Sequence, residues 1–183
     1  MTSKLKTDVL ETVSGSGTIA LTNQLSGMTT ASVPLLDHTK MPAGSVVQVV
    51  NATGNTEVSS TVINTWVGTS GSIFITPIYA NSKIAISHTA GGMVIGSGGD
   101  IGMRFKQVIS GGSNVYLSTS NRFGYTSTST WTPMSWAAIY VDSPNTTSAI
   151  EYSFEMRQTS ASGGQMRYCD TSHWNFILTE IKQ

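Results

Sequence analysis

The stretch "AIEYSFEMRQ", residues 149–158, alternates between apolar and polar side chains along nearly its whole length. Ile150, Tyr152, Phe154 and Met156 share one face, and glutamate, serine and arginine stand between them. Because successive side chains of a β-strand point to opposite faces, this pattern predicts a strand with one buried face and one face in water. The stretch therefore favours a sheet that packs on one side, and its neighbours along the chain decide what kind of sheet.

Short apolar runs of similar length recur from Gly44 to the C-terminus, and clusters of Gly, Ser, Asn or Pro separate them. No segment has the length and periodicity of a helix. This organisation predicts an all-β fold, an antiparallel two-sheet jelly-roll sandwich. The ten predicted strands are 45–51, 57–67, 72–78, 83–87, 101–109, 114–119, 135–143, 149–158, 165–170 and 175–182.

The first part of the chain, residues 1–43, is punctuated differently, with "SGSG" at 14–17. Residues 18–25, "TIALTNQL", are typical of an extended segment, whereas 4–13 fit either a helical stripe or a strand. We interpret residues 1–43 as an extended, β-rich N-terminal arm. Residues 44–183 then form the jelly-roll head.

Charge and cysteine content narrow the classes of partner. Ten Lys and Arg balance ten Asp and Glu, and charged residues make up only 11% of the chain, so nucleic acid is not expected as a partner. The chain shows neither a signal peptide's apolar segment nor a membrane span, so we expect no membrane insertion. The single cysteine, Cys169, cannot form an internal disulfide, and stability must come from burial and assembly.

Some predicted strands are apolar on both faces. In "SWAAIYV", residues 135–141, each of the two alternating sets is largely apolar, and "VVQVV" at 46–50 does not alternate. One face of a sandwich sheet normally meets water, so a doubly apolar strand needs a second cover. A loop, the arm or a neighbouring subunit would each provide that cover, and the residues alone leave these alternatives open.

Catalytic and cofactor motifs are absent from the sequence. It has no G-x-S-x-G elbow, phosphate-binding loop, H-E-x-x-H or C-x-x-C pair. "GSGGDIGM" at 96–103 resembles a dinucleotide loop, but Ile101 stands where a glycine is required, so we interpret it as a flexible strand connection. We expect no enzymatic activity and no cofactor.

Two other groups of residues have side chains that could bind a metal or catalyse a reaction. Cys169, Asp170 and His173 could supply three metal ligands, but no fourth lies nearby and a structural role is the better interpretation. Glu151 and Glu155 share one strand face about 13 Å apart, farther than a glycosidase pair requires. We expect both glutamates to be solvated.

Exposed aromatic rings in two predicted loops are the candidate contacts with a host-surface glycan or protein, because flat rings stack on sugars and anchor interfaces. The loops are "NRFGYTSTSTWTP" at 121–133 and "DTSHWNF" at 170–176. The alternative for the tryptophans is that they close the ends of the sandwich. The candidate residues are Arg122, Tyr125, Trp131, His173 and Trp174.

The opening "SKLKTDVLETVSGSGTIALTNQLSGM", residues 3–28, resembles the N-terminal segment of structural fibre proteins of tailed bacteriophages, especially marine ones. The rest of the chain is similar to the globular head of the same proteins, so the resemblance covers nearly the whole sequence. The segments that carry it are "GSVVQVVN" at 44–51, "SGSIFITPIYANSKIAIS" at 70–87, "YVDSPNTTSAIEYSFEMR" at 140–157 and "FILTEIKQ" at 176–183.

The resemblance implies a homotrimeric head of the tumour-necrosis-factor-like jelly-roll type on an intertwined arm. It implies a virion protein, on the tail or the capsid surface, that is assembled in the host cytoplasm and contacts other virion proteins through the arm. The expected function is that of a tail fibre or spike that contributes to host attachment. The alternatives are a capsid-surface decoration fibre and a small cupin-like or polysaccharide-degrading enzyme.

Overall fold

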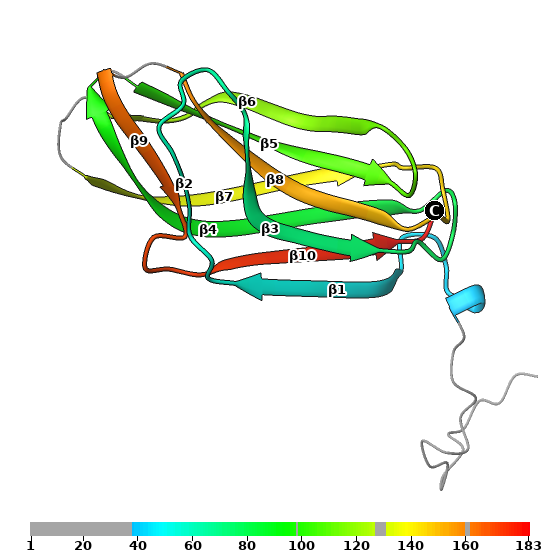
Figure 1. The fold of residues 1–183 in the computed structure, drawn as a ribbon. Coiled ribbons are helices and arrows are strands. Elements are labelled where there is room, and N and C mark those ends of the chain that lie inside the picture. Colours follow the sequence, from blue (N-terminus) through cyan, green and yellow to red (C-terminus); the bar gives the residue numbers. More distant parts are fainter. Residues whose placement is uncertain (1–37, 98, 127–130, 160–161) are drawn as a thin grey trace, which may run out of the picture. The chain divides into compact units, whose positions relative to one another are not determined.

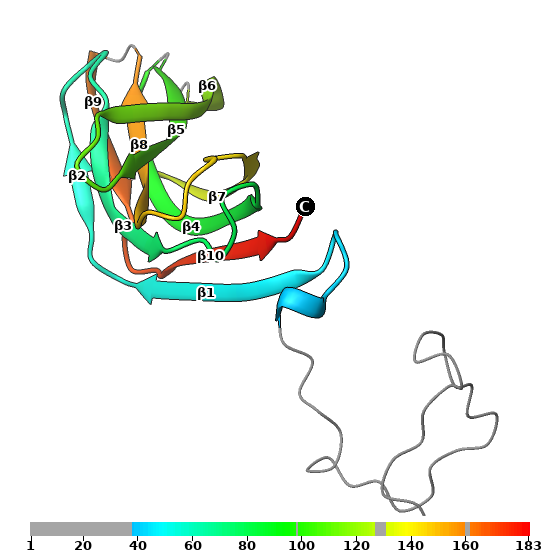
Figure 2. The same cartoon turned by 90° about the vertical axis from the view of Figure 1, so that its right-hand side faces the viewer.

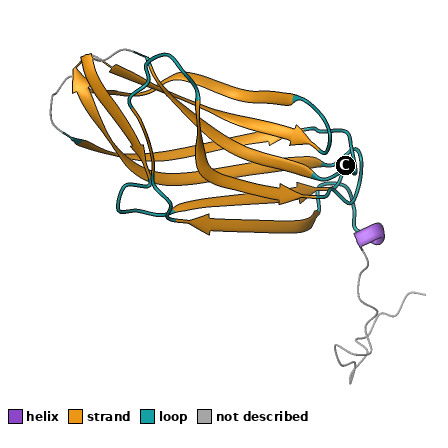
Figure 3. Cartoon of the chain, in the orientation of Figure 1, coloured by secondary structure: helices purple, strands orange, loops and turns teal. Residues whose placement is uncertain are grey.

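The computed structural model describes residues 38–97, 99–126, 131–159 and 162–183, with side chains described throughout these ranges except at 93–97, 99, 118–126, 162 and 163. Strands make up most of the described chain, together with one short 3₁₀ helix (Figures 1 and 3). The elements are η1 (His38–Lys40), β1 (Val46–Gly54), β2 (Val58–Ser60), β3 (Val67–Ile75), β4 (Lys83–Ser97), β5 (Gly99–Ile109), β6 (Asn114–Thr126), β7 (Thr132–Asp142), β8 (Ile150–Gln158), β9 (Ser162–Tyr168) and β10 (Trp174–Ile181).

The strands form two antiparallel sheets. Sheet A has the order β1-β10-β4-β9-β2, with β7 on the other edge of β4, and sheet B has the order β3-β8-β5-β6. Both β10 and β9 pair with the same edge of β4, because Trp174 lies opposite Ala90 and Tyr168 opposite Gly92. β1 and β2 follow in the same way along β10 and β9. We call β9 with β10, and β2 with β1, each one interrupted strand line, since each pair continues along the same edge. Sheet A is then four strand lines wide: β1/β2, β10/β9, β4 and β7.

Counted by strand lines, each sheet has four members and the chain crosses between the sheets repeatedly. Eight strand lines in two antiparallel sheets with these crossings are the jelly-roll arrangement. The predicted all-β, two-sheet antiparallel jelly-roll sandwich is thus confirmed. The predicted N-terminal arm at 1–43 lies outside the described residues except for 38–43.

The core lies between the two sheets and is built from the inward faces of their strands. The inward residues of "AIEYSFEMRQ" are almost fully buried, with Ile150, Tyr152 and Met156 at 0% exposure and Phe154 at 1%. This face confirms the predicted alternation. The other face of β8 differs from the prediction, because Glu155 is only 8% exposed.

An aromatic cluster fills the middle of the core around His88. The imidazole ring lies 4.4 Å from the ring of Phe154 and 4.6 Å from that of Phe176, centroid to centroid. Its Nε2 lies 3.1 Å from the hydroxyl oxygen of Tyr168. Burial lowers the pKa of His88 to about 4. The neutral imidazole therefore acts as one more flat ring of the core.

The interruption between β9 and β10 is a tight turn against β4. Cys169 and Thr171 both have positive φ angles, 58° and 52°, which are uncommon for residues with a side chain. The amide of Cys169 donates to the carbonyl of Gly91 over 2.8 Å. This bond keeps the broken strand line attached to β4 and lets Trp174 resume the pairing in register.

Two segments differ from their predictions. Residues 57–67 were expected to be one strand, but β2 ends at Ser60 and β3 begins at Val67. The interruption contains Asn64, with a φ of 60°, whose amide donates to the carbonyl of Gln158 over 2.7 Å. The expected connection at 96–103 is almost entirely strand, since β4 runs to Ser97 and β5 starts at Gly99. Glycine weakens a strand interior, but here pairing with β9 and β6 supplies the hydrogen bonds of the stretch.

The start of the described chain is held to its end. The amide of Gly44 donates to the carbonyl of Lys182 over 2.7 Å. The ammonium group of Lys182 donates in turn to the carbonyls of His38, Thr39 and Met41 over 3.3, 2.9 and 2.7 Å. Figure 2 shows η1 beside the beginning of β1, at the end of sheet A where the chain terminates.

Candidate functional site

The outer face of sheet A is the candidate functional surface, and the strand register defines it. Ile84, Ile86 and His88 of β4 point into the core, so Ala85, Ser87 and Thr89 point outward. The paired positions of β1, β10 and β7 share that side. The outer face of sheet A consists of Val49, Asn51, Thr53, Asn175, Ile177, Thr179, Ala85, Ser87, Thr89, Ala137, Ile139 and Val141.

None of these twelve side chains carries a charge, and several are apolar and bare. Ile139 is 77% exposed, Val49 59% and Val141 50%. The cross-strand rows Val49-Thr179-Ala85-Val141 and Asn51-Ile177-Ser87-Ile139 run across all four strand lines. The second face of "SWAAIYV", which the sequence predicted to need a cover, is therefore uncovered in the single chain.

The whole face, of which six of the twelve side chains are apolar, has the area of an ordinary surface patch. Four strand lines at about 4.8 Å spacing and six residues at about 3.3 Å span roughly 400 Å². A typical monomer's largest apolar patch is about 300–600 Å² and is often functional. β-branched and small side chains keep the face flat, which suits packing against another flat sheet.

Charged residues appear at the far margin of sheet A, beyond the interruption in β9 and β10. Arg167 lies 3.7 Å from a carboxylate oxygen of Glu57 and 3.5 Å from one of Asp170. The guanidinium carbon of Arg167 also lies 4.4 Å from the ring centroid of Trp131. A polar margin around an uncharged centre is the usual composition of a protein interface.

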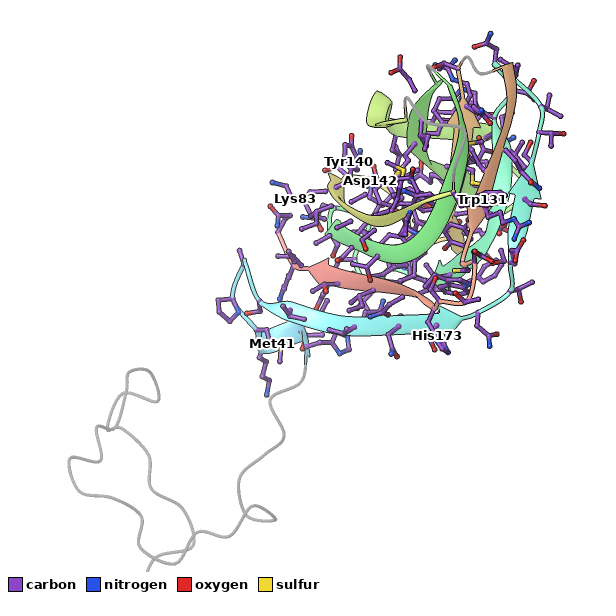
Figure 4. All side chains as sticks on the ribbon, turned by 90° about the vertical axis from the view of Figure 1, so that its left-hand side faces the viewer. Met41, Lys83, Trp131, Tyr140, Asp142 and His173 are labelled. Atoms are coloured by element: carbon purple, nitrogen blue, oxygen red, sulfur yellow. The ribbon has the colours of Figure 1, made fainter. Side chains whose placement is uncertain are left out.

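Trp131, one of the predicted contact residues, belongs to this margin. Its ring is partly exposed and stacks with Arg167, a cation-π arrangement worth about 0.5–1 kcal/mol at the surface. Figure 4 shows Trp131 beside β9, whereas His173 lies near the end of β1, so the two are not brought into one cluster. His173 is exposed in the loop between β9 and β10.

Trp174 was also predicted as an exposed contact, and for this residue the prediction is wrong. It is the first residue of β10 and only 7% exposed. Its indole lies so close to the backbone of Gly54 that a Cβ atom there would come within 2.7 Å of the ring. The alternative, that this tryptophan packs the interior, is the correct interpretation.

Arg122 and Tyr125 were predicted to lie in a loop, but both are strand residues of β6. Their backbone belongs to the β5–β6 part of sheet B, where Tyr125 pairs with Asp100. The Ser- and Thr-rich sequence around them suggested a loop, and main-chain pairing with β5 overrides that local preference. Their side chains lie outside the described residues, as does the segment 127–130 of the same predicted loop.

No group of three or more His, Cys, Asp or Glu side chains within the described ranges could hold a metal ion. Cys169, one of the three possible metal ligands named from the sequence, is buried, and burial raises the pKa of its thiol to about 11. The thiol is therefore largely protonated at neutral pH, and burial keeps it from solvent. Across the described part of the chain, no helix is long and apolar enough to cross a bilayer.

Buried carboxylates, which the sequence analysis did not single out, are used for structure. Glu180 is fully buried and accepts hydrogen bonds from the amides of Ile78 and Tyr79 and from Gln48 at 2.6–3.1 Å. Burial by itself raises the pKa of Glu180, but these donors outweigh it and the pKa lies below its ordinary value. Asp142 likewise accepts hydrogen bonds from Tyr152 and Gln107.

On the outer face of sheet B, a stacked array replaces the solvated glutamate that was expected. The guanidinium carbon of Arg104 lies 3.5 Å from the ring centroid of Tyr116 and 4.4 Å from that of Trp66. The same guanidinium contacts the Glu155 carboxylate at 2.6 Å, and Lys106 lies 3.7 Å from its other oxygen. Strand pairing brings these residues together, and because they are far apart in the sequence, no local pattern predicts the array.

Comparisons with known proteins found similarity at the level of structure only. No protein-family model and no curated protein matches the chain. Two structures of infectious bursal disease virus, of the Gt and Gx strains, match at 15% and 13% identity with TM-scores of 0.43 and 0.42, over 75% and 74% of this chain. A mutant VP2 protein of the same virus, in derived T=1 particles, matches at 11% identity with a TM-score of 0.41, over 76% of this chain. The chain spans about a third of the length of these solved chains, 34%, 32% and 37% respectively.

Proposed function

We propose that the protein is a non-enzymatic structural component of a bacteriophage virion, a homotrimeric tail fibre or spike whose head contributes to host attachment. The observation that carries the proposal is the uncovered outer face of sheet A, with Ile139 at 77% exposure on its edge strand β7. Ile139, Val49 and Val141 leave apolar area in water that a partner would bury, and exposed apolar patches often mark interaction sites. The sequence resemblance to phage fibre proteins supports the virion setting.

A second copy of the chain is the partner that the face fits best. None of the twelve side chains of this face carries a charge, and the nearest charges lie at its ends, Lys83 on β4 and Arg167 on β9, so two copies can meet over the uncharged part without like-charge repulsion. Closed symmetric assembly is the common outcome when identical chains associate, and in the proposed trimer each uncharged face would pack on a different part of the neighbouring subunit around the three-fold axis. Self-association would bury Ile139, Val141 and Val49 and so remove the exposed apolar area.

The assembly would leave sheet B and the loops facing outward, where a fibre head meets its host. Three heads on one tip present three copies of each surface, and linked weak contacts reinforce one another through effective concentration. The arm, residues 1–43, would connect the head to other virion proteins. Such a component works through shape and durability and needs no reacting group.

Light scattering of the purified full-length protein tests the assembly. The expected mass is three times that of the 19.4 kDa chain. Ile139→Asp should give monomers, because it places a charge where another subunit would pack. Val62→Asp is the matched control, since Val62 is 53% exposed in the segment between β2 and β3. A folded monomer as the only species at about 10 µM would contradict the proposal.

Immunogold labelling of virions with an antibody to the purified head tests the location. Label on the tail supports a fibre or spike, and label on the capsid surface supports the decoration fibre instead. Absence of the protein from purified virions, checked by mass spectrometry, would refute both.

A further inference from the structure

The outer face of sheet B has a small open hollow at the end of its central strands. Its volume is about 160 Å³, and it is lined by Phe74, Val108, Ser110, Ala149 and Glu151. Register explains the grouping, because Glu151 of β8 is the partner of Phe74 on β3 and of Val108 on β5. The amide of Ser110 donates to the carbonyl of Ala149 over 2.9 Å and closes the end of the hollow.

Phe74 is the most exposed aromatic ring among the large apolar side chains of the described residues, at 62%. It stands on a three-strand row, Phe74-Glu151-Val108, whose neighbours are spaced at about 5 Å. The fold gives this ring no packing role on the outer side of β3. A bare phenyl face next to an apolar floor is a surface for the C–H face of a flat ligand.

Glu151 supplies the polar part of the hollow. Within the described residues it forms no ion pair or hydrogen bond, and the other carboxylate of the same strand face, Glu155, is the one that Arg104 and Lys106 take up. The lining carries no positive charge. A ligand must therefore bring hydrogen-bond donors, and an anionic one would be repelled.

The geometry points to a neutral hexopyranose as the ligand of this hollow, with its C–H face on Phe74 and Val108 and two adjacent hydroxyl groups donating to the carboxylate of Glu151. The hydroxyl group of Ser110 offers a further partner. The volume is about half of the smallest drug-sized pockets, which agrees with a single sugar ring rather than an oligosaccharide. This site differs from the aromatic loop residues predicted from the sequence.

The affinity expected of one such subsite is low. A dozen ligand atoms at ordinary efficiency give a dissociation constant of roughly millimolar size. Binding of one sugar by one head does not require the proposed trimer. Only the gain in avidity rests on the proposed function, because it needs three heads on one tip. Presented three times on one tip, the same subsite would support attachment to a sugar-coated surface.

Saturation-transfer NMR on the full-length protein tests the inference. The probes are the methyl glycosides of D-glucose, D-galactose, D-mannose and N-acetyl-D-glucosamine, with N-acetylneuraminic acid as the anionic comparison. At least one neutral glycoside should receive saturation through its ring C–H protons, and the anionic sugar should not. Methylamine, run in parallel, reports whether the carboxylate selects a cation instead, an outcome that would overturn the assignment.

Phe74→Ala and Glu151→Gln should each weaken the neutral sugar by roughly tenfold or more, because they remove the stacking ring and the charged acceptor. Val62→Ala, on an exposed valine outside the hollow, should bind as the unmodified protein does. The inference would be overturned by equal saturation transfer in all variants. It would also be overturned if no neutral glycoside at millimolar concentration received saturation. Light scattering on the same samples reports the oligomeric state separately, so failure of the sugar site and failure of the assembly are distinguishable.

Discussion

Arg104 and Glu155 form a charge-assisted pair on the outer face of sheet B, with Nε and Nη2 of the arginine 2.7 and 2.6 Å from the same carboxylate oxygen. The two side chains are 14% and 11% exposed. The rings of Trp66 and Tyr116 lie 4.4 and 3.5 Å from the guanidinium carbon, centroid to carbon, and shield it from most of the water. The pair therefore joins β5 to β8 under an aromatic cover, and Glu155 differs in kind from Glu151, four residues earlier on the same strand face.

Glu155→Gln should lower the free energy of unfolding by about 2 kcal/mol or more, because it leaves a covered guanidinium without its counter-charge. Glu151→Gln is the matched control on the same strand and face, and it should change stability by no more than about 0.5 kcal/mol. Urea denaturation of both variants measures the difference. Equal effects would show that the Arg104–Glu155 pair contributes nothing beyond a surface charge.

Stability should fall as the pH is lowered from about 6.5 to about 4 because of His88. The folded-state pKa of His88 is about 4, below the ordinary 6.5, so within this window the unfolded chain binds a proton that the folded chain does not. The loss is on the order of 3 kcal/mol and ends below the folded pKa. His88→Phe, which keeps a ring beside Phe154 and Phe176, should lower stability overall but flatten this part of the pH profile. A profile of unchanged slope in the variant would rule out His88 as the cause.

Gly92→Ala should prevent folding or destabilise the protein by several kcal/mol, since a Cβ atom there would lie 2.3 Å from the carbonyl oxygen of Arg167. Backbone atoms of a paired strand cannot move aside without breaking the β4–β9 pairing. Gly68→Ala is the control, because a Cβ at Gly68 meets no atom within 4 Å. The two variants are compared by soluble yield and thermal melting, and a normal melting curve for Gly92→Ala would contradict the close approach of β9 to β4.

Lys182→Ala should release η1 without unfolding the head. The ammonium group donates to three carbonyls of residues 38–41 and lies 5.0 Å from the ring centroid of Tyr79. Hydrogen exchange should become faster at the amide of Met41, which donates to His38, and stay slow in β8. Lys83→Ala, at an exposed lysine on the start of β4, should leave both unchanged. Unchanged exchange at Met41 in the Lys182 variant would show that η1 is held by other contacts.

Trp174→Ala and Trp131→Ala should separate a packing tryptophan from a surface one. Removal of the buried Trp174 indole should cost about 3–5 kcal/mol, whereas Trp131→Ala should cost about 1 kcal/mol or less because only its stacking on Arg167 is lost. Thermal melting measures both. Similar losses in the two variants would mean that Trp131 also supports the interior.

Local pattern was enough for much of the fold. Alternation in "AIEYSFEMRQ" predicted the buried face of β8, and short apolar runs between turn residues predicted an antiparallel jelly roll, because side-chain periodicity depends only on strand geometry. Local pattern misassigned residues 96–103 and 121–126, where Gly, Ser and Thr are common but neighbouring strands supply the hydrogen bonds. It also left Trp174 open between a surface contact and a packing role and treated Glu155 as a solvated residue, because composition does not say what lies opposite a side chain.

Spacing along single strands was enough to predict the fold class, the inward residues of 149–158 and a doubly apolar strand at 135–141, since side-chain alternation is a property of each strand alone. Which residues become neighbours across strands follows from the folded arrangement of the sheets. Sheet register places Ile139 in line with Ile177 and Asn51, Arg104 against Glu155, and Phe74 beside Glu151. These relationships join residues far apart in the chain, and they depend on how the strands are paired, which no local pattern encodes.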